Sequence, residues 1–262
     1  MIVEDVDRRA IAALRFVHGV TGATIVRALQ IESPGLTLVR NLSGLRVVRE
    51  ARGLAAYTTA FDAPPKLTAR TPFALEIRDP LGQFLPRRFV LDLPRPTRGI
   101  DDPPVADGEQ ARDPVEIALL PAAAAPMPPA WALLRLAVQI QGSVPPRGLA
   151  NVWVEAQPRV PGKPMRRAQT DAAGEALIAV PDVGPVVGGA PLSSKFALDL
   201  SLVLDPELVR AAPDDDAQRR ALPLADASTA AARRGASRVE VVADIEMTAG
   251  ATRRHVVTLA WP

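Results

Sequence analysis

The chain has 262 residues, of which 48% are hydrophobic and 23% are charged, and this composition is typical of a globular protein. It contains no cysteine, which excludes disulfide bridges and cysteine-based zinc sites. Lysine and arginine total 31 against 29 acidic residues, and aromatic residues make up only 4%. Nucleic-acid binding favours a dense basic stripe with interleaved aromatics, so we expect no nucleic-acid partner.

Neither a secretory leader nor a membrane span is predicted. The first residues, MIVEDVDRRA, carry acids and no apolar stretch, so no signal peptide is expected there. The richest apolar segment, PAAAAPMPPAWALLRLAVQI, is broken by prolines, and a membrane-spanning helix needs a run of about eighteen apolar residues. We therefore expect a cytoplasmic protein with no membrane insertion.

Residues 1–95 are predicted to form an N-terminal β-sandwich. In LTLVRNLSGLRVVRE, Leu36 and Leu38 alternate before an Asn-Leu-Ser-Gly turn, and Leu45 and Val47 alternate after it. Asp-Pro-Leu-Gly at 79–82 is typical of a type I turn. Several short strands with turns about every eight to twelve residues indicate an all-β sandwich.

Residues 96–129 are predicted to be a Pro-rich acidic linker. Residues 99–130 hold one arginine against six acids, together with many prolines. Proline at this density cannot lie inside a sheet and favours extended, solvated backbone. The stretch VEIALLP leaves room for one edge strand, at residues 115–120.

Residues 130–262 are predicted to form a second β-sandwich. Leucine, valine and isoleucine alternate with other residues in LLRLAVQI, and Val152 and Val154 do the same in NVWVEA. In Thr-Asp-Ala-Ala-Gly at 170–174, the Asp side chain can bond the backbone two residues on, and the Gly favours positive φ. This order resembles the carboxypeptidase-regulatory-like, transthyretin-like (prealbumin-like) β-sandwich family over residues 133–182. The resemblance implies a fold and no reaction.

The fold class predicted is therefore all-β, with two tandem antiparallel sandwiches. The Ala-, Asp- and Arg-rich residues 205–238 break the strand pattern and are expected to form a mobile or partly helical insertion in the second sandwich. The two halves also share an order of strand, Gly turn, strand, polar-Gly turn and strand. Two explanations remain open for this shared order: duplication of one module, or the general requirements of short β-hairpins.

Catalytic, cofactor and metal sites are not predicted. The two histidines, His18 and His255, stand apart in the sequence, and no His pair at helical spacing and no third ligand accompanies them. Ser193, Ser194 and Lys195 contain a hydroxyl and an amine but no second catalytic motif, which favours a polar turn. We expect no enzyme and no cofactor.

The candidate interface residues are Arg87, Arg88, Phe89 and Trp153, on the predicted strands at 84–93 and 150–156, which we expect to offer sheet edges and flat β faces to other subunits. The two arginines precede apolar residues in the predicted strand at 84–93, and one of each neighbouring pair must face outward. Trp153 lies between Val152 and Val154 and so faces opposite to them. If the valines fill the core, Trp153 lies on the outer face and marks a contact site, and a core position for Trp153 is the alternative.

Two classes of function remain. One is a structural or assembly protein whose sandwiches bind other protein subunits, and the other is an accessory carbohydrate- or cell-surface-binding module. Surface modules are normally exported, so the absence of a predicted leader favours the assembly protein. The first domain, with ALRFVHGVTGATI and DPLGQFLPRRFVLDLPR, is similar to β-sandwich components of phage-tail-like contractile injection particles. That resemblance implies assembly in the cytoplasm and release as part of a particle.

Overall fold

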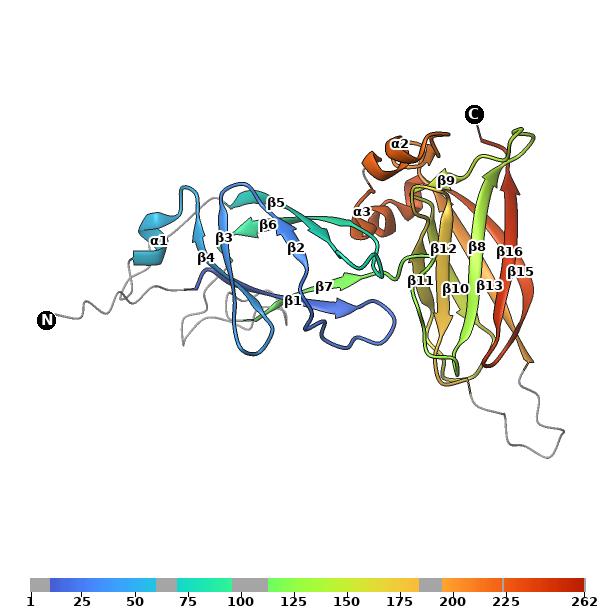
Figure 1. Ribbon diagram of the computed structural model, residues 1–262, viewed down its shortest axis with the longest axis horizontal. Helices are drawn as coiled ribbons and strands as arrows, with labels where there is room; N and C mark the ends of the chain where they lie inside the picture. The colour runs from blue at the N-terminus through green and yellow to red at the C-terminus, as the bar shows by residue number, and fades with distance from the viewer. Residues whose placement is uncertain (1–9, 60–69, 96–112, 184–194, 223, 262) are drawn as a thin grey trace, which may run out of the picture. The chain divides into compact units, whose positions relative to one another are not determined.

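The computed structural model describes residues 10–59, 70–95, 113–183, 195–222 and 224–261 (Figure 1). Strands dominate this part of the chain, and its three α-helices have only five or six residues each. The predicted all-β fold is therefore confirmed. The chain divides into two compact units: Met1–Ile77 with Arg88–Leu119, and Arg78–Arg87 with Leu120–Pro262.

This division differs from the predicted boundaries on both sides of the proposed linker. Strand β7 (Val115–Leu119) pairs with β1 (Ala12–His18) and buries Ile117 and Leu119, so it is part of the first unit. Beyond it, Leu120 and two alanines are buried in the second unit. The apolar alternation of VEIAL outweighs the prolines around it, because a paired strand can bury both apolar side chains. The rest of the predicted linker, residues 96–112, lies outside the described residues.

The first unit has two sheets that form a sandwich-like arrangement. One has the strand order β3-β4-β1-β7 and the other β2-β5-β6. The predicted hairpin around Asn41 is present, with β3 and β4 antiparallel. The other elements are β2 (Gln30–Glu32), β3 (Leu36–Arg40), β4 (Arg46–Ala51), α1 (Ala55–Thr59), β5 (Thr71–Arg78) and β6 (Arg87–Leu93).

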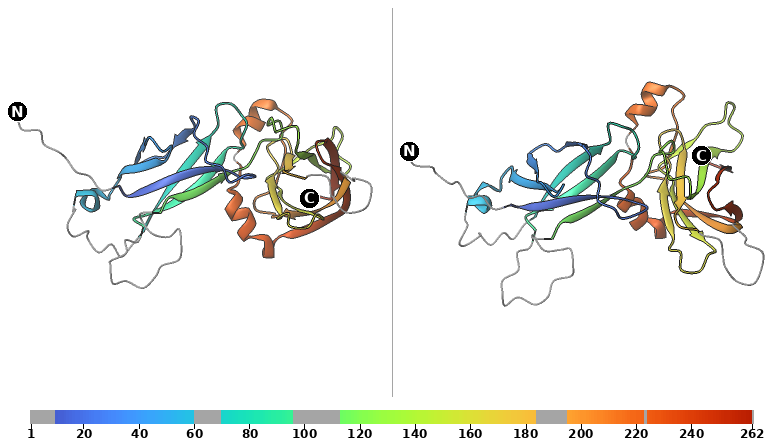
Figure 2. Two further views of the ribbon diagram at one scale, coloured as in Figure 1. Left: turned by 90° about the horizontal axis from the view of Figure 1, so that it is seen from below. Right: turned by 60° about the horizontal axis from the view of Figure 1, so that its bottom comes forward.

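The second unit is a β-sandwich whose main sheets have the orders β11-β10-β13-β15 and β12-β8-β16. Its apolar core takes buried side chains from both sheets, which lie face to face in Figure 2. Their strands are β8 (Ala132–Ile140), β10 (Trp153–Pro158), β11 (Arg166–Gln169), β12 (Glu175–Val180), β13 (Lys195–Leu204), β15 (Arg238–Thr248) and β16 (Thr252–Leu259). The smaller elements are β9 (Leu149–Ala150), β14 (Arg210–Ala211), α2 (Asp216–Ala221), α3 (Ala227–Ala232) and the 3-10 helix Arg234–Ala236.

Setting aside the two-residue strands β9 and β14, both units use the same strand topology. In each, the first strand pairs antiparallel with the fourth (β4 or β12) and parallel with the last (β7 or β16). The second, fifth and sixth strands form the opposite sheet in that order. Only the third strand differs, since β3 pairs with β4 whereas β11 pairs with β10. The echo in the sequence therefore corresponds to a shared arrangement of strands.

The turn before the fourth strand has the same hydrogen bonds in both units. In the second unit the Asp171 N–H donates to the Glu175 carbonyl, and in the first the Asn41 N–H donates to the Leu45 carbonyl. Gly174 and Gly44 close these turns with φ values of 82° and 80°. In the second unit the turn also packs on Gly148, where an added Cβ would lie 1.9 Å from the Ala173 carbonyl oxygen.

Candidate protein-binding surfaces

The structure places the predicted interface residues in two different settings. Arg87, Arg88 and Phe89 begin strand β6, which is the last strand of the sheet β2-β5-β6. Trp153 begins β10, which is paired on both sides, with β11 and β13. Strand β10 therefore has no free edge to offer to a partner. The backbone of β10 already pairs with a neighbouring strand on each side.

Strand β6 presents a mixed outer face. Its side chains alternate, so that Leu91 and Leu93 are buried while Arg88, Val90 and Asp92 are exposed. Val90 is 58% exposed, which is high for an apolar strand residue. Phe89 is half-buried on the inner side of the strand. Of the predicted residues on β6, Arg88 is the one fully available to a partner.

Arg87 is engaged within the second unit. Its Nε lies 3.4 Å from Asp226 Oδ2, and the two side chains are only 12% and 14% exposed. Asp226 is also the N-cap residue of α3, where its side chain accepts from the Ser228 N–H. Arg87 therefore holds α3 in place and is not an exposed contact residue.

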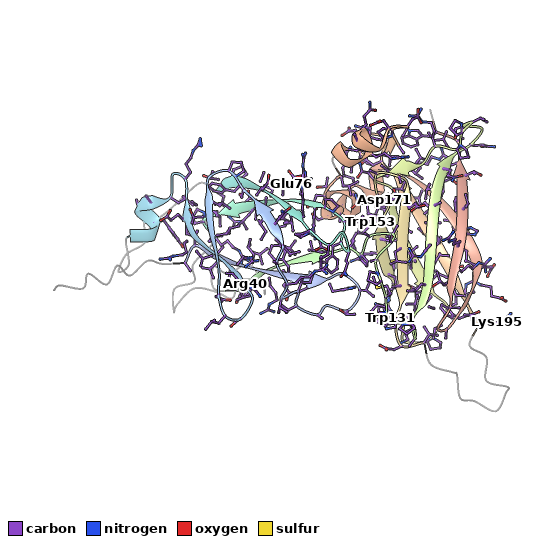
Figure 3. The ribbon with its side chains drawn as sticks, in the orientation of Figure 1. Arg40, Glu76, Trp131, Trp153, Asp171 and Lys195 are labelled. Atoms are coloured by element: carbon purple, nitrogen blue, oxygen red, sulfur yellow. The ribbon has the colours of Figure 1, made fainter. Side chains whose placement is uncertain are left out.

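Trp153 is buried, with 4% of its surface exposed, so the core alternative describes it (Figure 3). It does face opposite to Val152 and Val154, which belong to the main core. Its own side packs in a second apolar cluster, whose buried members are Leu85, Leu120, Val203, Leu224, Ala227 and Ala230. Its Nε1–H is buried and has no hydrogen-bond acceptor among the described residues. Leu224, Ala227 and Ala230 in this cluster come from the inserted segment around α3, which the strand pattern did not show.

A buried polar network attaches this insertion to the sandwich. Asn151 Nδ2 donates to the Leu208 carbonyl, and Asn151 Oδ1 accepts from the Ala225 N–H at 2.8 Å. Gln169 Nε2 donates to the Ala225 carbonyl at 3.0 Å. Buried amides with satisfied partners fix a local geometry. The segment at residues 205–238 is thus partly helical, as predicted. Hydrogen bonds between the Asn151 and Gln169 side chains and its backbone attach it to the sandwich.

A second attachment is ionic. Arg233 Nε lies 2.7 Å from Asp205 Oδ2 and forms an ion pair with it. Arg234 pairs with Glu155 on β10 at 2.9 Å. The first contact joins the C-cap of α3 to the residue that follows β13, and the second joins the 3-10 helix to β10, which carries Trp153.

The histidines lie in separate units. His18 Nδ1 accepts a hydrogen bond from the Val20 N–H, and burial lowers the His18 pKa. Burial also lowers the pKa of His255, with a smaller effect from Arg253. The described residues contain no group of three His, Cys, Asp or Glu side chains able to hold a metal ion. Ser193 and Ser194 lie outside the described residues, and Lys195 pairs with Glu246 at 3.0 Å.

Within the described parts of the chain, none of the helices combines the length and apolarity required to cross a bilayer. Comparison with known proteins gives no family: no family model matches the sequence, and no curated protein or solved structure matches it either.

Proposed function

We propose that this protein is a non-catalytic assembly protein that binds other protein subunits through strand β6 of its first unit. The observation that carries the proposal is the position of β6 at the end of its sheet, with Arg88, Val90 and Asp92 exposed on one face. An edge strand presents unpaired backbone groups that a partner strand can satisfy. The side chains on its exposed face then select the partner.

Strand β15, which also lies at the end of its sheet, is poorly suited to that role. Its pairing with β13 is interrupted by a bulge between Leu198 and Leu200, opposite Asp244, whose φ is 58°. Arg159 pairs with both Asp199 and Asp244 there, at 2.8 and 2.6 Å. Bulges and charges are common devices that block strand addition. The contrast favours β6 as the binding edge.

The exposed face of β6 suits a protein partner better than a partner that binds through charge alone. A cation, an apolar side chain and an anion follow one another at alternate positions, so a facing surface can match charge at two points and bury Val90 between them. A stable contact of this kind removes about 1,200–2,000 Å² of surface in total. Arg88 is the natural anchor, because arginine is enriched among residues that dominate binding energy.

We further propose that the second unit is a transthyretin-like, carboxypeptidase-regulatory-like domain and that the assembly is a phage-tail-like contractile injection particle. The first rests on the strand and turn order of residues 133–182, including the Thr170–Gly174 turn. The second rests on the similarity of the first unit's sequence to β-sandwich components of such particles.

The proposal is tested by affinity capture from native extracts with Arg88→Glu and with Val90→Asp. Both side chains are exposed, so we expect loss of co-purifying particle subunits while circular dichroism retains the β spectrum. Arg49→Glu is the matched control, because Arg49 is exposed on β4 of the other sheet and makes the same charge change. Unchanged capture by both β6 variants would reject the proposal. Such a result would place the contact elsewhere, whereas capture of no protein subunit by the wild type would favour the accessory carbohydrate- or cell-surface-binding module.

A further inference from the structure

The outer face of the sheet β12-β8-β16 contains a hollow that none of the preceding roles uses. Its volume is about 340 Å³, within the range of small ligand sites, and all of its lining residues belong to the second unit. The residues that define its chemistry are Arg135, Ala137, Gln139, Glu175, Arg254 and Val256.

The register of the three strands explains the hollow. Ala137 on the central strand β8 lies between Glu175 of β12 and Val256 of β16. Because the Ala137 side chain is only a methyl group, it forms a low floor of the hollow between the longer side chains of Glu175 and Val256. Residues two positions away on a strand point to the same face, which brings Arg135 to one end of the hollow and Gln139 to the other.

Two arginines lie side by side on neighbouring strands at the first end. Arg135 and Arg254 are direct partners in the parallel register of β8 and β16. Like charges directly opposite each other on neighbouring strands are unfavourable. Arg135 donates to the Ala123 carbonyl, which restrains one side chain. Arg254 forms no hydrogen bond or ion pair with any residue that the structure describes. A pair of facing arginines, one restrained by the Ala123 carbonyl and one exposed and without a partner among the described residues, is a site that an anion would stabilise.

The remaining lining residues narrow the kind of anion. Arginine forks match both carboxylate and phosphate, but the Glu175 carboxylate in the lining repels a doubly charged phosphate more than a singly charged carboxylate. The Gln139 amide can donate or accept beyond the arginines. No Trp, Tyr or Phe is among the described lining residues, so a sugar ring has no aromatic face on which to stack. Val256 is 55% exposed and offers an apolar contact beside the arginines.

We propose that this hollow binds a carboxylate side chain of an acidic peptide segment on a partner protein. The carboxylate lies between Arg135 and Arg254, and the adjoining methylene groups rest on Ala137 and Val256. Glu175 on the opposite edge strand opposes the negative charge and limits the affinity. This site goes beyond the binding edge at β6, since it lies in the other unit and shares no residue with it.

The test uses the full-length protein and a fluorescein-labelled peptide in which glutamate alternates with serine, with both ends blocked. Binding is followed by fluorescence anisotropy, with a matched glutamine peptide as the uncharged probe. We expect Arg254→Gln to weaken binding of the glutamate peptide about tenfold, the scale of one lost charge-assisted hydrogen bond. Ala137→Leu should weaken it by filling the hollow without any change of charge. Glu175→Gln should strengthen binding several-fold.

Arg253→Gln is the matched control, because Arg253 precedes Arg254 on β16 and donates to the Glu246 carbonyl, away from the hollow. It should bind like the wild type. Equal losses for Arg253→Gln and Arg254→Gln would show unspecific attraction by net charge and overturn the proposal. So would equal binding of the two peptides, or binding of an oligogalacturonate probe in place of the glutamate peptide. Because Arg88→Glu leaves the hollow intact, failure of the β6 proposal would not affect this result.

Discussion

The Oδ1 atoms of Asn41 and Asp171 accept the same hydrogen bond in the two units, from the backbone N–H four residues later, at 2.9 and 3.0 Å. Asp171 Oδ1 also accepts from the Ala173 N–H at 2.8 Å. The two turns therefore share one side-chain hydrogen bond and differ in the charge of the acceptor and in the added bond from Ala173. Substitution of Asp171 by Asn and by Ala separates the contribution of charge from that of hydrogen bonding.

Replacement of Asp171 by Asn should preserve the turn, whereas Asp171→Ala should lower the free energy of unfolding by about 1–2 kcal/mol, because two backbone donors lose their acceptor. Burial raises the pKa of Asp171, against the opposing effect of backbone hydrogen bonds from Glu175, Ala173 and Gly174. A raised folded-state pKa means that the folded state binds the proton more tightly. The wild type should therefore lose stability as pH rises from 3.8 through that raised pKa.

Urea unfolding between pH 3.5 and about 7 measures both effects. Asp171→Asn has no charge to bury, so its stability should lack this pH dependence and equal or exceed that of the wild type at neutral pH. A loss for Asp171→Asn as large as that for Asp171→Ala would contradict the assignment.

Gly174→Ala should destabilise the second unit far more than Gly162→Ala. Both glycines have positive φ, 82° and 74°, so both variants have the strain of a left-handed residue, roughly 1 kcal/mol. A Cβ on Gly174 would lie 2.6 Å from the backbone of Gly148 and Leu149, whereas one on Gly162 meets nothing within 4 Å. The difference in urea midpoint between the variants isolates the close approach. Similar midpoints would mean that the two turns can separate without cost.

Trp153→Phe should leave the free energy of unfolding unchanged or raise it slightly. The indole N–H is buried without an acceptor, so removing it costs no hydrogen bond, while the phenyl ring keeps most of the packing. Trp153→Ala should lower stability by about 3–5 kcal/mol through the cavity it leaves. Denaturation monitored by circular dichroism distinguishes the two. A strongly destabilised Trp153→Phe would show that the N–H is satisfied in solution.

The acid sensitivity around the β15 bulge should depend on Arg159. Hydrogen bonding from Arg159 lowers the pKa of Asp199, so the ion pair stabilises the fold above the ordinary pKa of aspartate, and this contribution is lost as pH falls through the lowered value. In Arg159→Gln the Asp199 pKa should rise toward its ordinary range, as read from carboxyl chemical shifts by NMR. High salt should narrow the difference, because the group is exposed. An unchanged titration would mean that the backbone N–H of Asp244 alone holds the carboxylate.

The features predictable from the sequence were those set by neighbours in the chain. The turns after Asn41 and Asp171 and the all-β pattern follow from local alternation and turn chemistry. The outward direction of Trp153 from Val152 and Val154 was predictable for the same reason. The burial of Trp153 was not predictable, because the apolar residues of α3 that pack against it come from a distant insertion whose sequence has no steady helical periodicity.

The candidate site was only partly predictable for a related reason. Arg88 and the edge position of β6 agree with the predicted edge, but Arg87 meets a partner 139 residues away. Nothing in the local pattern separates the two arginines. The hollow at Ala137 was missed altogether, since its two arginines meet only through the parallel pairing of the first and last strands of the second unit.

That parallel pairing sets the order of events during synthesis. Strand β8 leaves the ribosome long before β16, and β1 long before β7, so one side of each first strand has no partner while the intervening residues are being made. Such nascent edges favour mispairing with neighbouring chains. Each unit therefore folds to completion only after its last strand has been translated. Its yield in a cell depends on how well the unpaired side of the first strand is protected from other chains until then.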